Sequence, residues 1–507
     1  MAKNRVVAAI DIGSNSLRLL IAEARPRARL RELDRLVVPI MIGRDTFTSG
    51  RISNSTLREV QTVLKGFARK MKEYGVSSYR AIATSAVREA LNRDTFLDSL
   101  QTASGLSIQV VEAIEETRLV HQVVARSLGP ALKKPGKTLM LLALGAGSAE
   151  ITVFKDGSLI STETGRIGTL RLVQTLASDA SDRLLYQRLS AFVINVATTL
   201  ERVHDIPRID TLVTVNTELH ELLDKASFRG VRRSDGLIRL SAPTFRSIAR
   251  RVQSTPVERR VSRWHLGYDA AETLTPALIV VQSFLDTTSA REILVPHVSV
   301  LDSLLLDVLS TAPSFEDEIV ASALSIGRKY RFDEAHSLHV ARLSLMLFDQ
   351  LQSFCSLKPE YRLLLRISAV LHDIGIFVSS RSHHKHSEYL ILQSEILGVS
   401  AEDLQIIAQV ARYHRRATPR ETHFAYWALP QPSRVAVSKI AAILRLADAL
   451  DRNHSQEIVS VRALPADDEL TLEVKSRGDL LVDEWALEAK ADLFREVFGL
   501  PVTLSRA

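Results

Sequence analysis

The 507-residue sequence has a single cysteine, few aromatic residues and no long apolar run. Cys355 is that cysteine, so an intrachain disulfide is impossible and thiol chemistry is not indicated. No apolar run approaches the ~18 residues that span a bilayer, and the stretch at 6–10 is too short for a signal sequence. We therefore expect a soluble, cytoplasmic protein that does not associate with the membrane.

Aromatic residues make up 6% of the chain and are not interleaved with its basic clusters. This argues against a surface on which nucleic-acid bases stack, so no specific nucleic-acid partner is expected. The net charge of +7 favours anionic partners, although composition alone does not choose among nucleotide, polyphosphate, nucleic acid and membrane surface. Groups of arginine and lysine, such as those at 25–35, 259–263 and 412–420, suit a channel for a long polyanion.

The length predicts about three domains at roughly 150 residues each. We expect an α/β lobe at 1–125, a second α/β lobe at 126–305, and an all-α domain with a small C-terminal cap at 306–507. The third region holds nine of the fourteen histidines. No low-complexity or proline-rich linker separates the three.

Both lobes begin with the same pattern, an apolar strand, a turn of small residues and a second strand, which indicates an internal duplication. In the first lobe we expect strands at 5–11, 16–23, 35–42, 79–84 and 107–111, and helices at 53–74, 94–104 and from 115. In the second we expect a strand-turn-strand at 138–154, a hairpin turn at 155–157, and helices at 169–204, 242–254 and 270–285. Alternating apolar residues at 459–483 predict two or three strands in the C-terminal cap.

The two turns of small residues are candidate anion cradles. Gly13, Ser14, Asn15 and Ser16 form the first; Gly145, Ala146, Gly147 and Ser148 form the second. Small side chains let backbone N–H groups approach phosphate oxygens closely. Taken alone, the glycines are equally compatible with ordinary β-turns.

Four motifs in order resemble the exopolyphosphatase/guanosine pentaphosphatase (Ppx/GppA) family. They are Asp11-Ile-Gly-Ser-Asn-Ser16, Ala83-Thr-Ser-Ala-Val-Arg-Glu-Ala90, Glu115-Glu-Thr-Arg-Leu119 and Gly145-Ala-Gly-Ser-Ala-Glu150. The resemblance implies duplicated lobes of the actin-like, Hsp70-like ATPase (ribonuclease H-like) fold, with the active site between them. It also implies hydrolysis of the terminal phosphoanhydride of inorganic polyphosphate or of the guanosine pentaphosphate alarmone (pppGpp), and makes a homodimer plausible.

The resemblance also implies roles for individual residues. Glu116 matches the general base, Arg88 would bind the departing negative charge, and Glu150 would help to hold Mg²⁺. Asp11 belongs to the first phosphate-binding turn. Without the resemblance, Glu116 and Arg88 would be read as solvated residues near helix N-termini.

The sequence departs from the family pattern at the second turn. Ala143 stands where the resemblance leads us to expect a metal-binding aspartate, and 215–218 lacks an expected glycine pair. Loss of a carboxylate weakens a divalent-metal site. Three functions stay open for the lobes: an exopolyphosphatase of reduced activity, a pppGpp phosphohydrolase, and a weakly active or inactive regulator that binds polyphosphate or alarmone.

The helical region contains a second set of motifs. His336, the pair His372-Asp373, and Asp448 resemble the H…HD…D pattern of the HD phosphohydrolase superfamily. Imidazoles and carboxylates from separate helices can bind a divalent metal, whose identity is open, and a metal-bound water would attack a phosphate ester. A nucleotide phosphohydrolase at this HD site is therefore a further alternative.

Other residues of this region are weaker candidates. His386 and His414 could serve a second metal or a phosphate, although each alone reads more simply as a surface or core histidine. His339 suits the first metal less well than His336. Asp451 is expected to be a charge on a helix surface.

Overall fold

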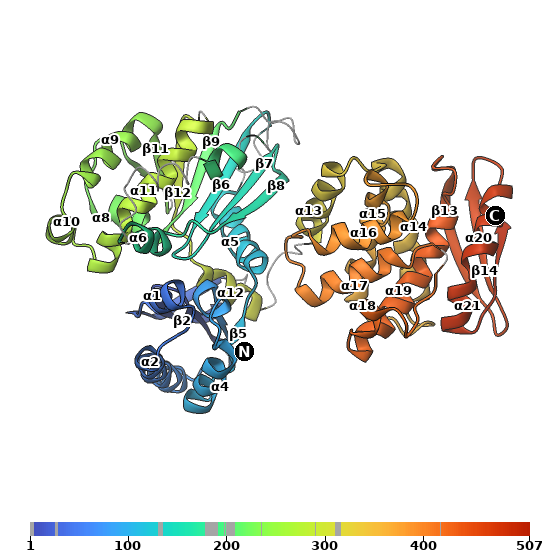
Figure 1. The fold of residues 1–507 in the computed structure, drawn as a ribbon, viewed down its shortest axis with the longest axis horizontal. Helices are drawn as coiled ribbons and strands as arrows, with labels where there is room; N and C mark the ends of the chain where they lie inside the picture. The colour runs from blue at the N-terminus through green and yellow to red at the C-terminus, as the bar shows by residue number, and fades with distance from the viewer. Residues whose placement is uncertain are drawn as a thin grey trace. The chain divides into compact units, whose positions relative to one another are not determined.

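The structure is a computed structural model that describes residues 5–25, 29–129, 135–177, 191–196, 198, 208–234, 236–288, 290–309, 316–415 and 417–507. The chain forms two compact units, Met1–Phe315 and Glu316–Ala507 (Figure 1). The first unit holds both α/β lobes, and the second holds the helical region and its cap.

The first lobe is a five-stranded sheet of order β3-β2-β1-β4-β5 with helices packed on it. Its elements are β1 (Arg5–Ile12), β2 (Ser16–Arg25), β3 (Arg29–Pro39), α1 (Ile42–Ser49), α2 (Asn54–Glu73), β4 (Ser78–Ala83), α3 (Ser85–Arg88), α4 (Arg93–Ser104), β5 (Gln109–Val110) and α5 (Ala113–Leu128). Strand β1 is almost wholly apolar and buried, as expected for a central strand that is covered on both faces.

The second lobe has a seven-stranded sheet of order β10-β11-β12-β9-β6-β7-β8. Its elements are β6 (Thr138–Leu144), β7 (Ala149–Lys155), β8 (Ser158–Gly165), α6 (Thr169–Ala177), β9 (Thr211–Val215), α8 (Thr217–Lys225), β10 (Arg232–Ser234), β11 (Leu237–Ser241), α9 (Ala242–Gln253), α10 (Val257–Trp264), α11 (Tyr268–Thr288) and β12 (Glu292–Pro296), after which α12 (Val300–Val308) returns to the first lobe. The expected helix at 169–204 is observed as α6; most of its remainder lies outside the described residues.

Strand pairing confirms the duplication. Within each lobe, two antiparallel pairs are followed by a parallel one: β3-β2-β1-β4 in the first sheet and β8-β7-β6-β9 in the second. Equivalent strands therefore bring their turns to equivalent positions. The lobes are not strictly consecutive in the chain, because α12 packs Leu301, Leu304 and Leu305 against the sheet of the first lobe.

The second unit is a helical bundle followed by a small sheet and two helices. Its elements are α13 (Glu316–Lys329), α14 (Glu334–Leu351), α15 (Tyr361–Leu371), η3 (Ile374–Phe377), α16 (His383–Leu392), α17 (Ala401–Arg412), α18 (Phe424–Trp427), α19 (Gln431–Ala449), β13 (Ile458–Pro465), β14 (Leu470–Ser476), α20 (Leu481–Lys490), α21 (Asp492–Phe498) and β15 (Val502–Arg506). Strand β14 pairs antiparallel with β13 and parallel with β15.

The prediction of a third strand at the end of 459–483 was wrong. Leu480 and Val482 belong instead to the start of helix α20, whose first turn carries Asp483 and Glu484. Acidic residues stabilise a helix N-terminus, and alternation over only three residues does not distinguish strand from helix. Among the described residues, no helix combines the length and apolarity needed to cross a bilayer.

Candidate functional site

The two glycine turns of the first unit have matching geometry and face one cleft. Gly13 N–H donates to the carbonyl of Ser16 at 3.1 Å, and Gly145 N–H donates to that of Ser148 at 3.0 Å. Residues 13–16 and 145–148 both line one cleft. The structure therefore brings the two predicted cradles together.

The second turn lies directly against the first lobe. A Cβ at Gly147 would lie 2.4 Å from Ser85 Oγ, so glycine is required for this approach. The Ser85 hydroxyl in turn hydrogen-bonds that of Ser14 at 3.0 Å. Residues of both lobes thus form one continuous polar wall.

Four carboxylates, those of Asp11, Glu116, Glu150 and Glu218, also line the cleft. Burial raises the pKa of Glu116 to about 6, with a lowering effect of Arg88 and a raising effect of Asp11. Glu116 Oε2 is buried and accepts no hydrogen bond from the described residues. A carboxylate with a pKa close to neutral suits a general base.

Arg88 lies beside Glu116 and not among the residues that line the cleft. Its Nη1 atom donates to the Val111 carbonyl at 2.6 Å and lies 3.6 Å from Glu116 Oε2. This places Arg88 to orient Glu116. Arg18, which the sequence prediction did not include, does line the cleft, and it donates to Ser16 Oγ at 3.0 Å.

The residues around the second turn show what the missing carboxylate changes. Ala143 lies on β6 directly across from Glu150 on β7, and both line the cleft. Glu150 offers the oxygen ligands that Mg²⁺ prefers, while Ala143 offers none. In place of the expected glycine pair, Asn216 caps α8 and donates to the Leu144 carbonyl at 3.0 Å.

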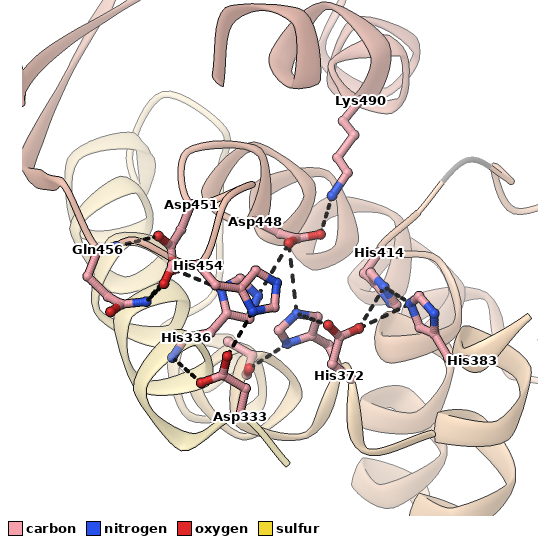
Figure 2. A network of polar contacts seen from close by, with 12 residues as sticks. Asp333, His336, His372, His383, His414, Asp448, Asp451, His454, Gln456 and Lys490 are labelled. Atoms are coloured by element: carbon pink, nitrogen blue, oxygen red, sulfur yellow. Dashed lines mark hydrogen bonds and ion pairs between the residues drawn. The ribbon is translucent and has the colours of Figure 1, made fainter. Parts of the chain in front are cut away.

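The predicted HD residues of the second unit form a buried cluster (Figure 2). His336 lies in the first turn of α14, His372 and Asp373 follow α15, and Asp448 lies in the last turn of α19. The ligand atoms of His336, His372 and Asp448 lie within 4.8 Å of one another. This set can hold a metal ion.

Charges inside the cluster oppose the effect of burial. Burial lowers the pKa of His372 to about 4, which favours the neutral imidazole that binds metals. Burial alone would raise the pKa of Asp448, but Lys490 and His372 bring it below its usual value. The Lys490 ammonium, from α20, forms an ion pair with Asp448 Oδ2.

Two further histidines, His383 and His414, contact Asp373. Their Nε2 atoms lie 3.1 Å and 3.3 Å from Asp373 Oδ1. His414 was a predicted accessory residue, while His383 was missed. The other predicted accessory residues differ: His339 accepts a hydrogen bond from Arg342, and His386 belongs to none of the metal-binding groups found among the described residues.

The prediction that Asp451 is a surface charge was wrong. Its side chain is buried, and its Oδ2 atom accepts a hydrogen bond of 2.8 Å from His336 Nδ1. The turn after α19 carries Asp451 inward, and a buried carboxylate needs such a partner. His454, also missed, stacks on His336 with 3.6 Å between ring centroids and contacts Asp333 at 2.9 Å.

The duplicated lobes and the cleft of backbone turns and carboxylates define a phosphohydrolase with the actin-like fold. Sequence profiles agree with this class: that of the Ppx/GppA phosphatase family matches residues 20–311, and that of Ppx/GppA phosphatase domain III matches residues 320–496. The chain belongs to the Ppx/GppA phosphatase family, which confirms the predicted resemblance and enzyme class.

Individual relatives are distant. The guanosine-5'-triphosphate,3'-diphosphate pyrophosphatase of Photobacterium profundum is 21% identical over 457 residues, which cover 87% of this chain and 84% of that protein. An exopolyphosphatase structure from Cytophaga hutchinsonii has a TM-score of 0.53 at 19% identity, covering 61% of this chain and 99% of that one. The structure of an exopolyphosphatase-like protein has a TM-score of 0.50 at 20% identity, covering 60% of this chain and 97% of that one. These structures confirm the predicted fold of the lobes.

Proposed function

We propose that the cleft of the first unit releases terminal phosphate from inorganic polyphosphate. The observation that carries this proposal is the pair of turns, 13–16 and 145–148, facing Glu116 across one cleft. Backbone N–H groups on two sides suit a chain of phosphates, and the net positive charge of the chain favours a polyanion. The terminal phosphoanhydride of pppGpp has the same chemistry and is the alternative substrate.

In this mechanism Glu116 accepts a proton from water as the water oxygen bonds to the terminal phosphorus. The bond from phosphorus to the bridging oxygen breaks, and the shortened polyphosphate leaves with the negative charge, which Arg18 helps to balance. Asp11 and Glu150 are the oxygen donors that would hold Mg²⁺, and the ion would neutralise phosphate charge. Arg88 keeps the Glu116 carboxylate in place.

The test is phosphate release from long-chain polyphosphate by the full-length protein with Mg²⁺. Glu116→Gln should lower release by about 10²–10⁴, and Asp373→Ala should leave it unchanged. The same assay with pppGpp decides between the two substrates. If the unmodified protein releases no phosphate from either, the proposal fails.

Two other functions have specific support. Ala143, which offers no metal ligand beside Glu150, favours a weakly active protein that binds polyphosphate or alarmone and regulates a partner. Tight binding without phosphate release would identify that case. The buried cluster around His372 favours a metal-dependent nucleotide phosphohydrolase in the second unit, which would lose activity with Asp373→Ala and tolerate Glu116→Gln.

A further inference from the structure

Helix α6 begins against the second turn, 145–148, and its first backbone N–H groups bind carbonyl groups of that turn. Thr169 N–H donates to the Gly145 carbonyl at 2.9 Å, and Leu170 N–H donates to the Ala146 carbonyl at 3.0 Å. Both contacts join main chain to main chain, so they do not depend on which side chains the helix carries. They hold the first two peptide groups of the turn.

The third peptide group of the turn is held by a side chain, because Arg171 Nε donates to the Gly147 carbonyl at 2.9 Å. A trans peptide group places its carbonyl and its N–H on opposite sides. Three carbonyl groups directed at α6 therefore direct the N–H groups of residues 146–148 away from it. Those residues line the cleft, where their N–H groups can meet an anion.

Gly147 makes the third peptide group the easiest of the three to turn over. Glycine has no Cβ, so it rotates about its backbone bonds at little steric cost. A peptide group turned over at this position would direct the Gly147 carbonyl, the negative end of its dipole, toward a bound phosphate. A hydrogen bond from a charged guanidinium is stronger than one between neutral groups, so Arg171 is suited to oppose that rotation.

Arg171 is itself fixed by two residues of the first lobe. Its Nη2 atom donates to Glu89 Oε1 at 2.8 Å, and its guanidinium carbon lies 4.0 Å from the centroid of the Phe47 ring. Nε and Nη2 share one edge of the planar guanidinium, so this edge holds the Gly147 carbonyl and the Glu89 carboxylate together. A lysine has the same charge but no such edge.

We propose that Arg171 is a positioning residue for the phosphate-binding turn 145–148. It holds one carbonyl group of the turn away from the cleft, and it is not among the described residues that line the cleft. Glu89 directly follows Arg88, which lies beside Glu116, so Arg171 also fixes the turn relative to the segment that orients the base. The inference rests on the proposed function, since it requires that the turn binds phosphate.

The experiment measures polyphosphate binding by calorimetry with Mg²⁺ present. The full-length parent protein carries Glu116→Gln, so that the ligand is not consumed. In this parent, Arg171→Ala should weaken binding by about tenfold, the effect of losing roughly one hydrogen bond. Arg171→Lys should weaken it to a similar extent, because the charge alone does not hold both partners. Full affinity in either variant overturns the proposal.

Arg166 provides the matched control. Its guanidinium lies 3.2 Å from the same Glu89 carboxylate, but its side chain is 76% exposed. Arg166→Ala should bind polyphosphate as tightly as the parent protein. An equal loss in Arg166→Ala and Arg171→Ala would assign the effect to the lost positive charge and would overturn the proposal.

Added guanidinium ion separates positioning from folding. At concentrations far below those that unfold proteins, it should restore affinity to Arg171→Ala, because the ion can bind the Gly147 carbonyl and Glu89 together. It should not restore affinity to Arg171→Lys, whose side chain still fills the space. A loss of affinity in Arg171→Ala that guanidinium does not reduce overturns the proposal.

Failure of the proposed function gives different results. A parent protein that binds no polyphosphate overturns both proposals. Binding that depends on Arg171, in a protein whose unmodified form releases no phosphate, overturns the phosphohydrolase and supports the role of Arg171.

Discussion

The cleft of the first unit and the histidine cluster of the second are formed by different kinds of chemical groups. The cleft is lined by two backbone turns and a few carboxylates, whereas the cluster consists of histidine and aspartate side chains. The cleft lacks a carboxylate at Ala143, while the cluster has every residue of its motif. A site lined by backbone keeps its shape when one side chain is lost. The chemistry of the site can still change.

Of the substitutions that distinguish the two sites, Glu116→Gln should have the largest effect. We expect phosphate release to fall by about 10²–10⁴, the usual contribution of a general base. Steady-state kinetics with polyphosphate measure the effect, with Asp373→Ala as the control. Equal losses in both variants would show that the two sites act as one.

Lys490→Gln tests the cluster by removing the ammonium beside Asp448. Without cations, the buried carboxylate is left unpaired, so we expect the free energy of unfolding to fall by about 3 kcal/mol. The same change should tighten the binding of a divalent cation by the cluster, because a competing positive charge is gone.

Thermal unfolding and cation titration measure these opposite effects of Lys490→Gln. Lys475→Gln, an exposed lysine on β14, is the control and should change neither. A loss of both stability and cation affinity would contradict the competition.

Ala143→Asp should make the cleft more like the cluster by adding a metal ligand beside Glu150. We expect turnover with Mg²⁺ to rise about tenfold, because one more carboxylate positions the ion and the phosphate. Initial rates measured against Mg²⁺ concentration provide the test. Ala143→Asn adds a similar volume without the charge and should give little gain; the absence of a gain in both variants would mean that the missing carboxylate does not limit turnover.

The smallest effect concerns pH. Glu116 acts as a base only when deprotonated, and its pKa is raised to about 6. Activity should therefore rise with pH, by about fourfold between pH 5.5 and pH 7. The pH dependence of kcat/KM measures this, and a flat profile over that range would remove Glu116 from the rate-determining proton transfer.

The sequence predicted the duplicated lobes because each begins with an apolar strand and a glycine turn, which are local signals. It did not predict β15 or α20, since short apolar alternation around Leu480 fits both strand and helix. Helix α2 was predicted to within one residue at each end, because capping residues such as Ser53 are also local signals.

Candidate site residues within short motifs, such as Glu116 and Asp373, were found in the sequence. Arg18, His383 and Asp451 were not, because their roles depend on contacts between elements. His383 reaches Asp373 only because Gly375 lets α16 pack closely. No periodicity along the chain carries that information.

The contact between Gly147 and Ser85 has a dynamic consequence. Because the second turn lies against the first lobe, opening the lobes separates the two turns and loosens the polar wall at the same time. Under the proposed function, a polyanion that required such an opening would enter before the site was complete, and closure would assemble the site around its end. Admission of the ligand and assembly of the site would then be one movement.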